Sequence, residues 1–115
     1  KIYVEIGNLL SCWKPDVLAL EDVYVYNAFP KAAIQLGEVR GVICLAAQDC
    51  KLAVQMIKPT EIKSCLTGNG RASKQQVQRS VQTILQLREP IRPDHASDAA
   101  ALALIAASRR GFFQW

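Results

Sequence analysis

The sequence predicts an α/β fold in which two strands lie parallel in one sheet. Two short, continuous apolar runs, Val17–Leu20 and Leu52–Ile57, are typical of strands that are buried on both faces. Segments with helical spacing of apolar residues lie before, between and after these runs. The order is therefore helix, strand, helix, strand and three further helices, and such alternation predicts a parallel pair of strands.

The first predicted helix covers residues 1–13, where apolar residues repeat at helical spacing up to Leu10, and Pro15 follows its end. The first strand comes next and stops at Glu21 and Asp22. Ligands of open α/β sheets gather just beyond the carboxyl ends of strands, so this acidic pair is well placed for chemistry. An acidic turn after a strand is the alternative interpretation.

The second predicted helix is long and runs from Pro30 to about Cys50. Gly37 and Gly41 lie about one turn apart within it and leave a groove in its surface. A glycine inside a soluble helix costs about 1 kcal/mol relative to alanine. We therefore expect another helix to approach closely at these glycines, either from the same chain or from a second subunit.

A short helix is predicted from Thr60 to Leu66, and a turn separates it from a capping box formed by Ser73 and Gln76. The helix that begins there extends to Glu89.

Two cations accompany the start of this helix, Lys74 in its first turn and Arg71 just before it. Backbone amides at a helix start together with two cations form a phosphate site, although a solvated loop is the alternative. The residue before the lysine is serine rather than glycine, so the loop is not a Walker A motif.

The last predicted helix covers Pro93–Ala107, and its first turn carries His95 and Asp98 on one face. Burying an imidazole and a carboxylate together is costly unless another group satisfies them. A metal ion would do so, because both side chains are ligands of first-row metals. The alternative is a first turn that is merely polar and solvated.

The composition favours a single ordered domain, since 50% of the 115 residues are hydrophobic and 21% are charged. The net charge of +4 is concentrated in residues 58–92, which hold seven basic and two acidic side chains. A protein that binds a phosphate backbone needs such a segment, although an ordinary solvated face with excess lysine is also compatible with it.

Cysteine spacing and the lengths of apolar runs indicate the cellular compartment in which we expect this protein. The four cysteines show no C-x-x-C spacing, so we expect reduced thiols in a cytosolic protein, not zinc ligands or disulfides. No signal peptide is visible, and the apolar run Ala99–Ala107 is far shorter than the ~20 residues that a membrane span requires. We expect no membrane partner.

Taken together, these motifs resemble the RuvC family of Holliday junction resolvases, and the resemblance covers nearly the whole chain. The loop repeats the family's G-x-G-x-A-x-K-x-Q-V spacing at residues 68–77. The remaining matches are KPDVLALEDVY at 14–24, AIQLGEVRGV at 33–42 and PDHASDAAALALIAA at 93–107. The resemblance implies a ribonuclease H-like fold, with a central mixed sheet flanked by helices.

The resemblance also implies a homodimeric endonuclease that cuts two strands of like polarity in a four-way DNA junction with Mg²⁺. Glu21, His95 and Asp98 match metal ligands of the family, and Lys63 and Lys74 match its catalytic lysines. Many relatives carry aspartate at the histidine position, so a preference shifted towards Mn²⁺ is compatible with this site. No cofactor beyond the metal is implied.

Further contacts follow from the same resemblance. Tyr24 matches an aromatic residue that stacks on bases near the junction centre, and Lys63, Arg71 and Lys74 are expected to bind DNA. The helix at 30–50 corresponds to the helix that packs across the dimer axis. A branch-migration helicase complex is the implied partner, and the bacterial cytoplasm is the implied location.

One departure from the family is that its first aspartate, in a G-I-D-P-G strand motif, has no counterpart here. We therefore expect residues 1–115 to be a partial domain that starts within the first helix, with the first three strands of a five-stranded sheet missing. Such a chain would be a fragment, an incomplete gene product or a partial model of a longer protein, and we expect it not to cut DNA.

Two other functions remain open. One is a non-catalytic nucleic-acid-binding or scaffold protein derived from this fold. The other is a ribonuclease H-like nuclease that acts on RNA hybrids or on a different branched DNA.

Overall fold

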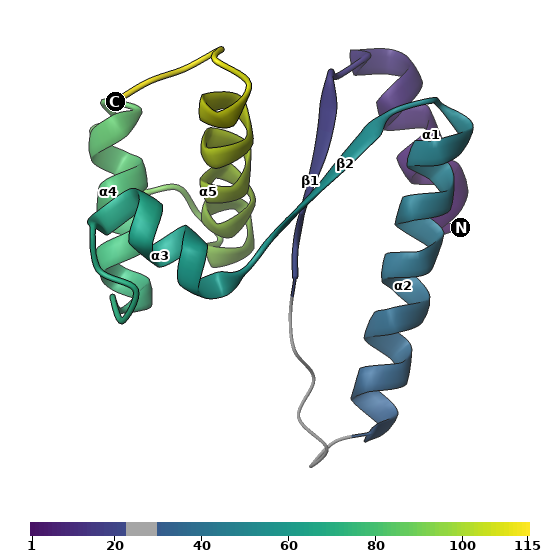
Figure 1. Cartoon of the computed structure of the whole chain (residues 1–115), viewed down its shortest axis with the longest axis horizontal. Coiled ribbons are helices and arrows are strands. Elements are labelled where there is room, and N and C mark those ends of the chain that lie inside the picture. The colour runs from purple at the N-terminus through teal and green to yellow at the C-terminus, as the bar shows by residue number, and fades with distance from the viewer. Residues whose placement is uncertain (23–29) are drawn as a thin grey trace. The chain divides into compact units, whose positions relative to one another are not determined.

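The computed structural model describes residues 1–22 and 30–115. They divide into two compact units. One contains residues 1–18 and 30–55, and the other contains residues 19–22 and 56–115. Figure 1 shows the elements coloured in chain order.

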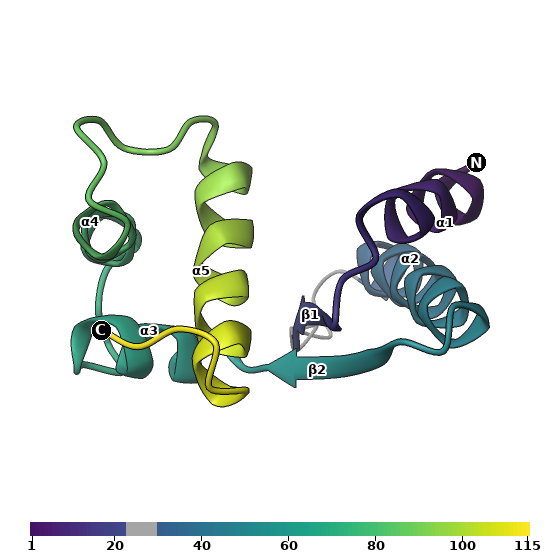
Figure 2. The ribbon, with the colours of Figure 1, turned by 90° about the horizontal axis from the view of Figure 1, so that it is seen from above.

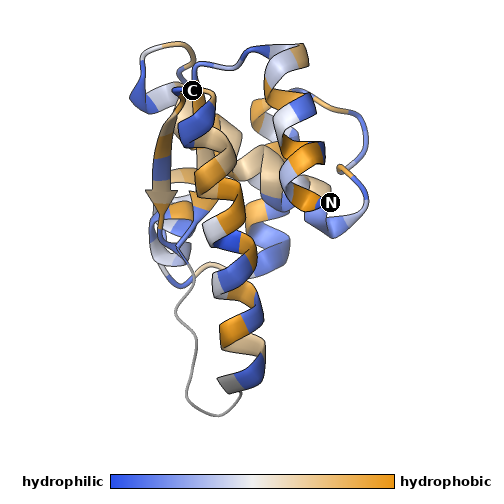
Figure 3. Ribbon diagram, turned by 90° about the vertical axis from the view of Figure 1, so that its right-hand side faces the viewer, coloured by the Kyte–Doolittle hydropathy of each residue, from blue (hydrophilic) through white to orange (hydrophobic). Residues whose placement is uncertain are grey.

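The sheet contains two neighbouring strands, β1 (Val17–Glu21) and β2 (Ala53–Ile57), and Figures 1 and 3 show them running in the same direction. The predicted α/β fold with a parallel pair is confirmed. The expectation of strands buried on both faces is wrong, because every side chain of β1 is half-buried and β2 has exposed side chains at Ala53 and Met56. Among the described residues each strand has only one neighbour, so each has an open edge.

In the first unit, α1 (Ile2–Trp13) packs against α2 (Pro30–Asp49), and Figures 1 and 2 show the two helices side by side. α1 ends because Lys14 adopts a left-handed conformation (φ 45°) and Pro15 cannot donate a backbone hydrogen bond. The Tyr3 hydroxyl donates a hydrogen bond to Asp49 Oδ2, and this contact raises the pKa of Tyr3. These helix bounds agree with those predicted from apolar spacing.

α2 presents apolar side chains to its surroundings along much of its length, and Figure 3 shows hydrophobic and hydrophilic residues mixed along it. Ile34 is 63% exposed and Leu45 is 53% exposed. A Cβ added at Gly37 or Gly41 would meet nothing within 4 Å. Within the described parts of this chain, therefore, no helix approaches these glycines closely, and that half of the expectation is wrong.

The second unit builds a core from three helices, α3 (Pro59–Thr67), α4 (Lys74–Ile84) and α5 (Asp94–Arg109), and the end of β2. Figures 1 and 2 show these helices grouped together. Their largest fully buried side chains are Ile57, Val81 and Ile105. Packing in this core determines which faces of α3, α4 and α5 contact one another. The candidate site is formed by residues of these same helices and of β1.

α4 ends at Ile84, earlier than the predicted end at Glu89. Gln86 adopts a left-handed conformation (φ 55°), which turns the chain out of the helix. The Gln82 side chain then donates to the carbonyl oxygens of Leu87 and Arg88 at 3.3 and 3.2 Å.

All four cysteines are free of disulfide bonds. Among the residues that the structure describes, no helix combines the length and the apolar character that crossing a membrane would require.

Candidate functional site

A pocket of about 290 Å³ lies within the second unit and contains four of the side chains expected to perform chemistry. Glu21, Lys63, Lys74 and Asp98 line it, each from a different element. Its apolar walls are Pro59, Ile62, Val77 and Ala101. Two carboxylates and two ammonium groups therefore share one cavity.

Glu21 reaches the pocket because it is the last residue of β1. The next residue, Asp22, donates its backbone N–H to the carbonyl of Ile57 at 2.8 Å, which ties the ends of the two strands together. The carboxyl end of a parallel strand is where α/β sheets place ligand-binding residues, as the sequence predicted for Glu21.

Lys63 lies on α3, which is capped at both ends and linked to α5 near its start. At its start, Glu61 Oε1 accepts the backbone N–H of Lys58 at 3.2 Å, and Arg109 of α5 donates to Glu61 Oε2 at 2.6 Å. The hydrogen bond from Arg109, and next the one from Lys58, lower the pKa of Glu61. At its end, Gly68 caps the helix with φ 79°, a conformation that favours glycine.

The turn between α3 and α4 positions Lys74 through local hydrogen bonds. Asn69 Oδ1 accepts the backbone N–H of Arg71 at 2.9 Å, and the Asn69 carbonyl accepts that of Ala72 at 3.0 Å. Ser73 Oγ then accepts the N–H of Gln76 at 3.1 Å, while Gln76 Oε1 accepts the N–H of Ser73 at 2.8 Å. The predicted capping box is confirmed, and it makes Lys74 the first residue of α4.

Asp98 lies in the second turn of α5 and forms an ion pair with Lys74, with Nζ 3.4 Å from Oδ2. This pair joins α4 to α5 at the pocket. The two side chains are 51% and 43% exposed, so water screens their attraction. No pattern in the sequence predicts this contact, because the two residues belong to separate helices.

The other candidate residues lie outside the lining of the pocket. His95 is exposed in the first turn of α5, and Arg71 is exposed in the turn before α4. The structure thus brings Asp98 to Glu21 but does not add His95 to the same cavity. Tyr24 lies outside the described residues.

Two carboxylates are the donor set that this pocket offers to a cation. Mg²⁺ prefers oxygen ligands, retains several waters and is commonly held by one or two carboxylates, so Glu21 and Asp98 fit it chemically. Within residues 1–22 and 30–115, no group of three or more His, Cys, Asp or Glu side chains is arranged to hold a metal.

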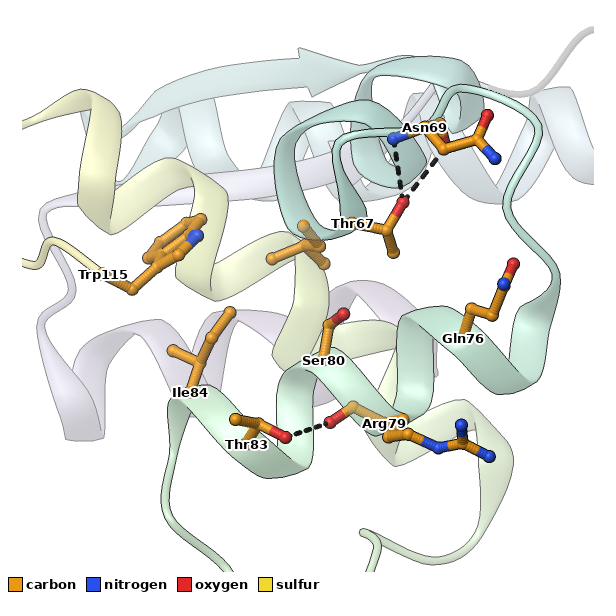
Figure 4. A pocket seen from close by; sticks show the side chains of 9 residues that line it. Thr67, Asn69, Gln76, Arg79, Ser80, Thr83, Ile84 and Trp115 are labelled. Carbon is orange, nitrogen blue, oxygen red and sulfur yellow. Dashed lines mark hydrogen bonds between the residues drawn. The ribbon is translucent and has the colours of Figure 1, made fainter.

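A larger pocket of about 550 Å³ lies on another side of α4 (Figure 4). Among the described residues that line it, Arg79 alone is charged, and the others carry hydroxyl, amide or apolar side chains. Figure 4 shows Trp115 and Ile84 at one end of this pocket and Gln76 at the other. Because no Asp or Glu is among the described residues of its lining, these residues do not offer the donor set of a metal-dependent hydrolase.

The profile of the family described as "Crossover junction endodeoxyribonuclease RuvC" matches residues 1–106. The protein of that description from Moorella thermoacetica is 43% identical over 107 residues, covering 93% of this chain and 64% of the relative. The one from Caldicellulosiruptor saccharolyticus is 38% identical over 103 residues, covering 90% of this chain and 61% of the relative. The chain thus spans less than two thirds of the length of these relatives.

Solved structures of RuvC proteins also match this chain. The RuvC structure from Thermus thermophilus matches 96% of this chain and 68% of its own, with a TM-score of 0.82 and 30% identity. The T. thermophilus RuvC in complex with a Holliday junction substrate matches with a TM-score of 0.81 and 27% identity, over the same shares of both chains.

Proposed function

This chain belongs to the RuvC family of crossover junction endodeoxyribonucleases, and on that premise we propose that it forms part of an enzyme that resolves four-way DNA junctions by metal-dependent phosphodiester hydrolysis. The observation that supports the proposal is the pocket in which Glu21 and Asp98 lie with Lys63 and Lys74. The complex of a related RuvC with a Holliday junction substrate supports the choice of DNA substrate.

Glu21 and Asp98 are proposed to hold the divalent cation, with His95 as a further ligand from the turn preceding Asp98. A bound Mg²⁺ would supply an activated water and stabilise the leaving oxygen of the phosphodiester. Mn²⁺ is the alternative metal, because imidazole suits a softer cation better than Mg²⁺.

The two lysines of the pocket are proposed to act on the phosphate itself. Lys63 and Lys74 present ammonium groups from two helices, where they would donate to phosphate oxygens and counter the charge that develops in the transition state. Arg71 would contact the DNA backbone beside them, and Tyr24 would stack on an unpaired base.

The remaining partners are proposed on the same premise. α2, with its exposed apolar side chains, would pack against a second copy to form a homodimer. A branch-migration helicase complex would deliver the junction in the bacterial cytoplasm.

The test is cleavage of synthetic DNA by the product of the complete reading frame, with Mg²⁺ or Mn²⁺, on four-way junction, linear duplex and RNA–DNA hybrid. We expect cutting of the junction alone, and its loss in Glu21→Gln but not in the control Glu89→Gln, which changes an exposed acid outside the pocket. Cutting of the hybrid instead would indicate a different nuclease of this fold.

The 115 residues alone are proposed to bind the junction without cutting it, because their described pocket offers two carboxylates. Robust cutting by this chain would contradict that. Salt-sensitive binding without cleavage, even by the complete product, would favour the non-catalytic alternative.

A further inference from the structure

The cation partner of Asp98 in this structure is an amino group of the same chain. Lys74 Nζ lies 3.4 Å from Asp98 Oδ2, within the cavity that Glu21 also lines. The Lys74 ammonium and a divalent cation held by Asp98 would carry like charges close together, so the two compete for this carboxylate.

The position of Lys74 gives this ion pair a second role. Lys74 is the first residue of α4, where the positive end of the helix dipole disfavours a cation. Asp98 provides the compensating negative charge from α5. Because both side chains are about half exposed, the pair is weak and can be exchanged for another contact.

We propose that Lys74 stays paired with Asp98 until a divalent cation enters the pocket and takes its place. The displaced Lys74 ammonium then binds the DNA phosphate. One ammonium–carboxylate contact is broken, and one carboxylate–cation contact replaces it, so no covalent bond changes. This inference rests on the proposed function and deepens it, since it couples metal entry to the availability of a phosphate-binding lysine.

The coupling has a direct consequence for affinity. The ion pair competes with the metal for Asp98, so removing Lys74 should tighten metal binding. Removing any positive charge near the site also strengthens cation binding, because it removes a repulsion. A control variant must therefore remove an equal charge that is not paired with Asp98. Lys63 supplies the matched control, because it lines the same pocket and carries the same charge, while the structure pairs Asp98 with Lys74.

The experiment is calorimetric titration of Mn²⁺ into the 115-residue chain, for the natural sequence and for Lys74→Gln, Lys63→Gln and Lys74→Arg. We expect Lys74→Gln to lower the dissociation constant by about two- to fivefold more than Lys63→Gln does, the range that an exposed ion pair can supply. Lys74→Arg retains a cation that can pair with Asp98, so we expect its dissociation constant to stay within about twofold of the natural chain.

Equal effects of Lys74→Gln and Lys63→Gln would overturn the inference and leave the proposed function intact. Tightening in Lys74→Arg as large as in Lys74→Gln would overturn it as well. If neither the natural chain nor any variant binds Mn²⁺, the metal site of the proposed function is contradicted, and so is the inference. Circular dichroism of each variant shows whether the helices are retained.

Discussion

Glu61 and Arg109 form a single contact that lowers the pKa of a carboxyl group and joins two helices. Their 2.6 Å hydrogen bond joins α3, which carries Lys63, to α5, which carries Asp98. The contact is exposed, so its effect on the free energy of unfolding is small, but its effect on the carboxyl group can be measured directly.

Arg109→Gln should raise the pKa of Glu61 towards its ordinary value of 4.5, because the largest cause of the lowered pKa is removed. A folded-state pKa that is depressed contributes stability above the unfolded pKa, and this contribution is lost as the pH falls through the folded pKa. The natural chain should therefore lose more stability than Arg109→Gln as the pH drops below about 4.5.

An NMR titration of the Glu61 side chain, together with urea denaturation at several pH values, measures both effects. Arg110→Gln is the control, because it removes the neighbouring charge without touching the hydrogen bond to Glu61. A Glu61 pKa that rises equally in both variants would contradict this account.

The place of a residue can be predicted from sequence where its type coincides with the end of an element. Ligands gather beyond the carboxyl ends of parallel strands, and Glu21, at the end of β1, lines the pocket, while its role as a metal ligand stays a prediction. Helical spacing puts His95 on one face with Asp98, yet His95 does not line that cavity. Spacing fixes only an angular sector, and the core residues of α5 decide which part of that sector faces the pocket.

At the scale of elements, the capping box of α4 determines where Lys74 begins the helix. Ser73→Ala should destabilise the folded chain by about 1 kcal/mol, because the N–H of Gln76 loses its acceptor. Ser73→Gly should cost only a few tenths of a kcal/mol, since glycine is tolerated at this position.

Urea denaturation followed by circular dichroism compares the two variants. Equal destabilisation by both would mean that the serine side chain does not act as the cap.

The elements themselves were predictable wherever a local signal marks their bounds. α1 ends at Lys14-Pro15, and α4 starts at Ser73, both as expected from residue type. Apolar spacing predicts too late an end for α4, because Gln86 turns the chain out of the helix and Gln82 binds the carbonyls of Leu87 and Arg88. Such a contact depends on the path of the chain after the helix, which local patterns do not carry.

At the scale of the whole molecule, the exposed apolar side chains of α2 lead to a prediction about assembly. Ile34→Glu should weaken self-association on the order of tenfold or more, because it places an unpaired charge in the proposed dimer contact. Gln35→Glu is the matched control, since it adds the same charge at the adjacent exposed polar position.

Sedimentation equilibrium over a range of concentrations measures the dimer dissociation constant. A constant that is unchanged in Ile34→Glu, or weakened equally in Gln35→Glu, would remove α2 from the interface.

The order of elements and the parallel pairing of β1 and β2 could be predicted because apolar runs and their alternation are encoded locally. Burial of the strands could not, because it depends on which neighbours cover the sheet rather than on the strand's own residues. The ion pair between Lys74 and Asp98 belongs to the same class of feature, since it arises only when α4 and α5 pack.

The central claim is that Glu21 and Asp98 hold one divalent cation. A double-mutant cycle of Mn²⁺ binding tests it most directly, with Glu21→Gln, Asp98→Asn and the double variant. If both carboxylates hold one ion, each single change removes most of the affinity, and the double variant loses much less than the sum of the two losses. Additive losses, or a single change without effect, would show that Glu21 and Asp98 do not share a metal and would contradict the account.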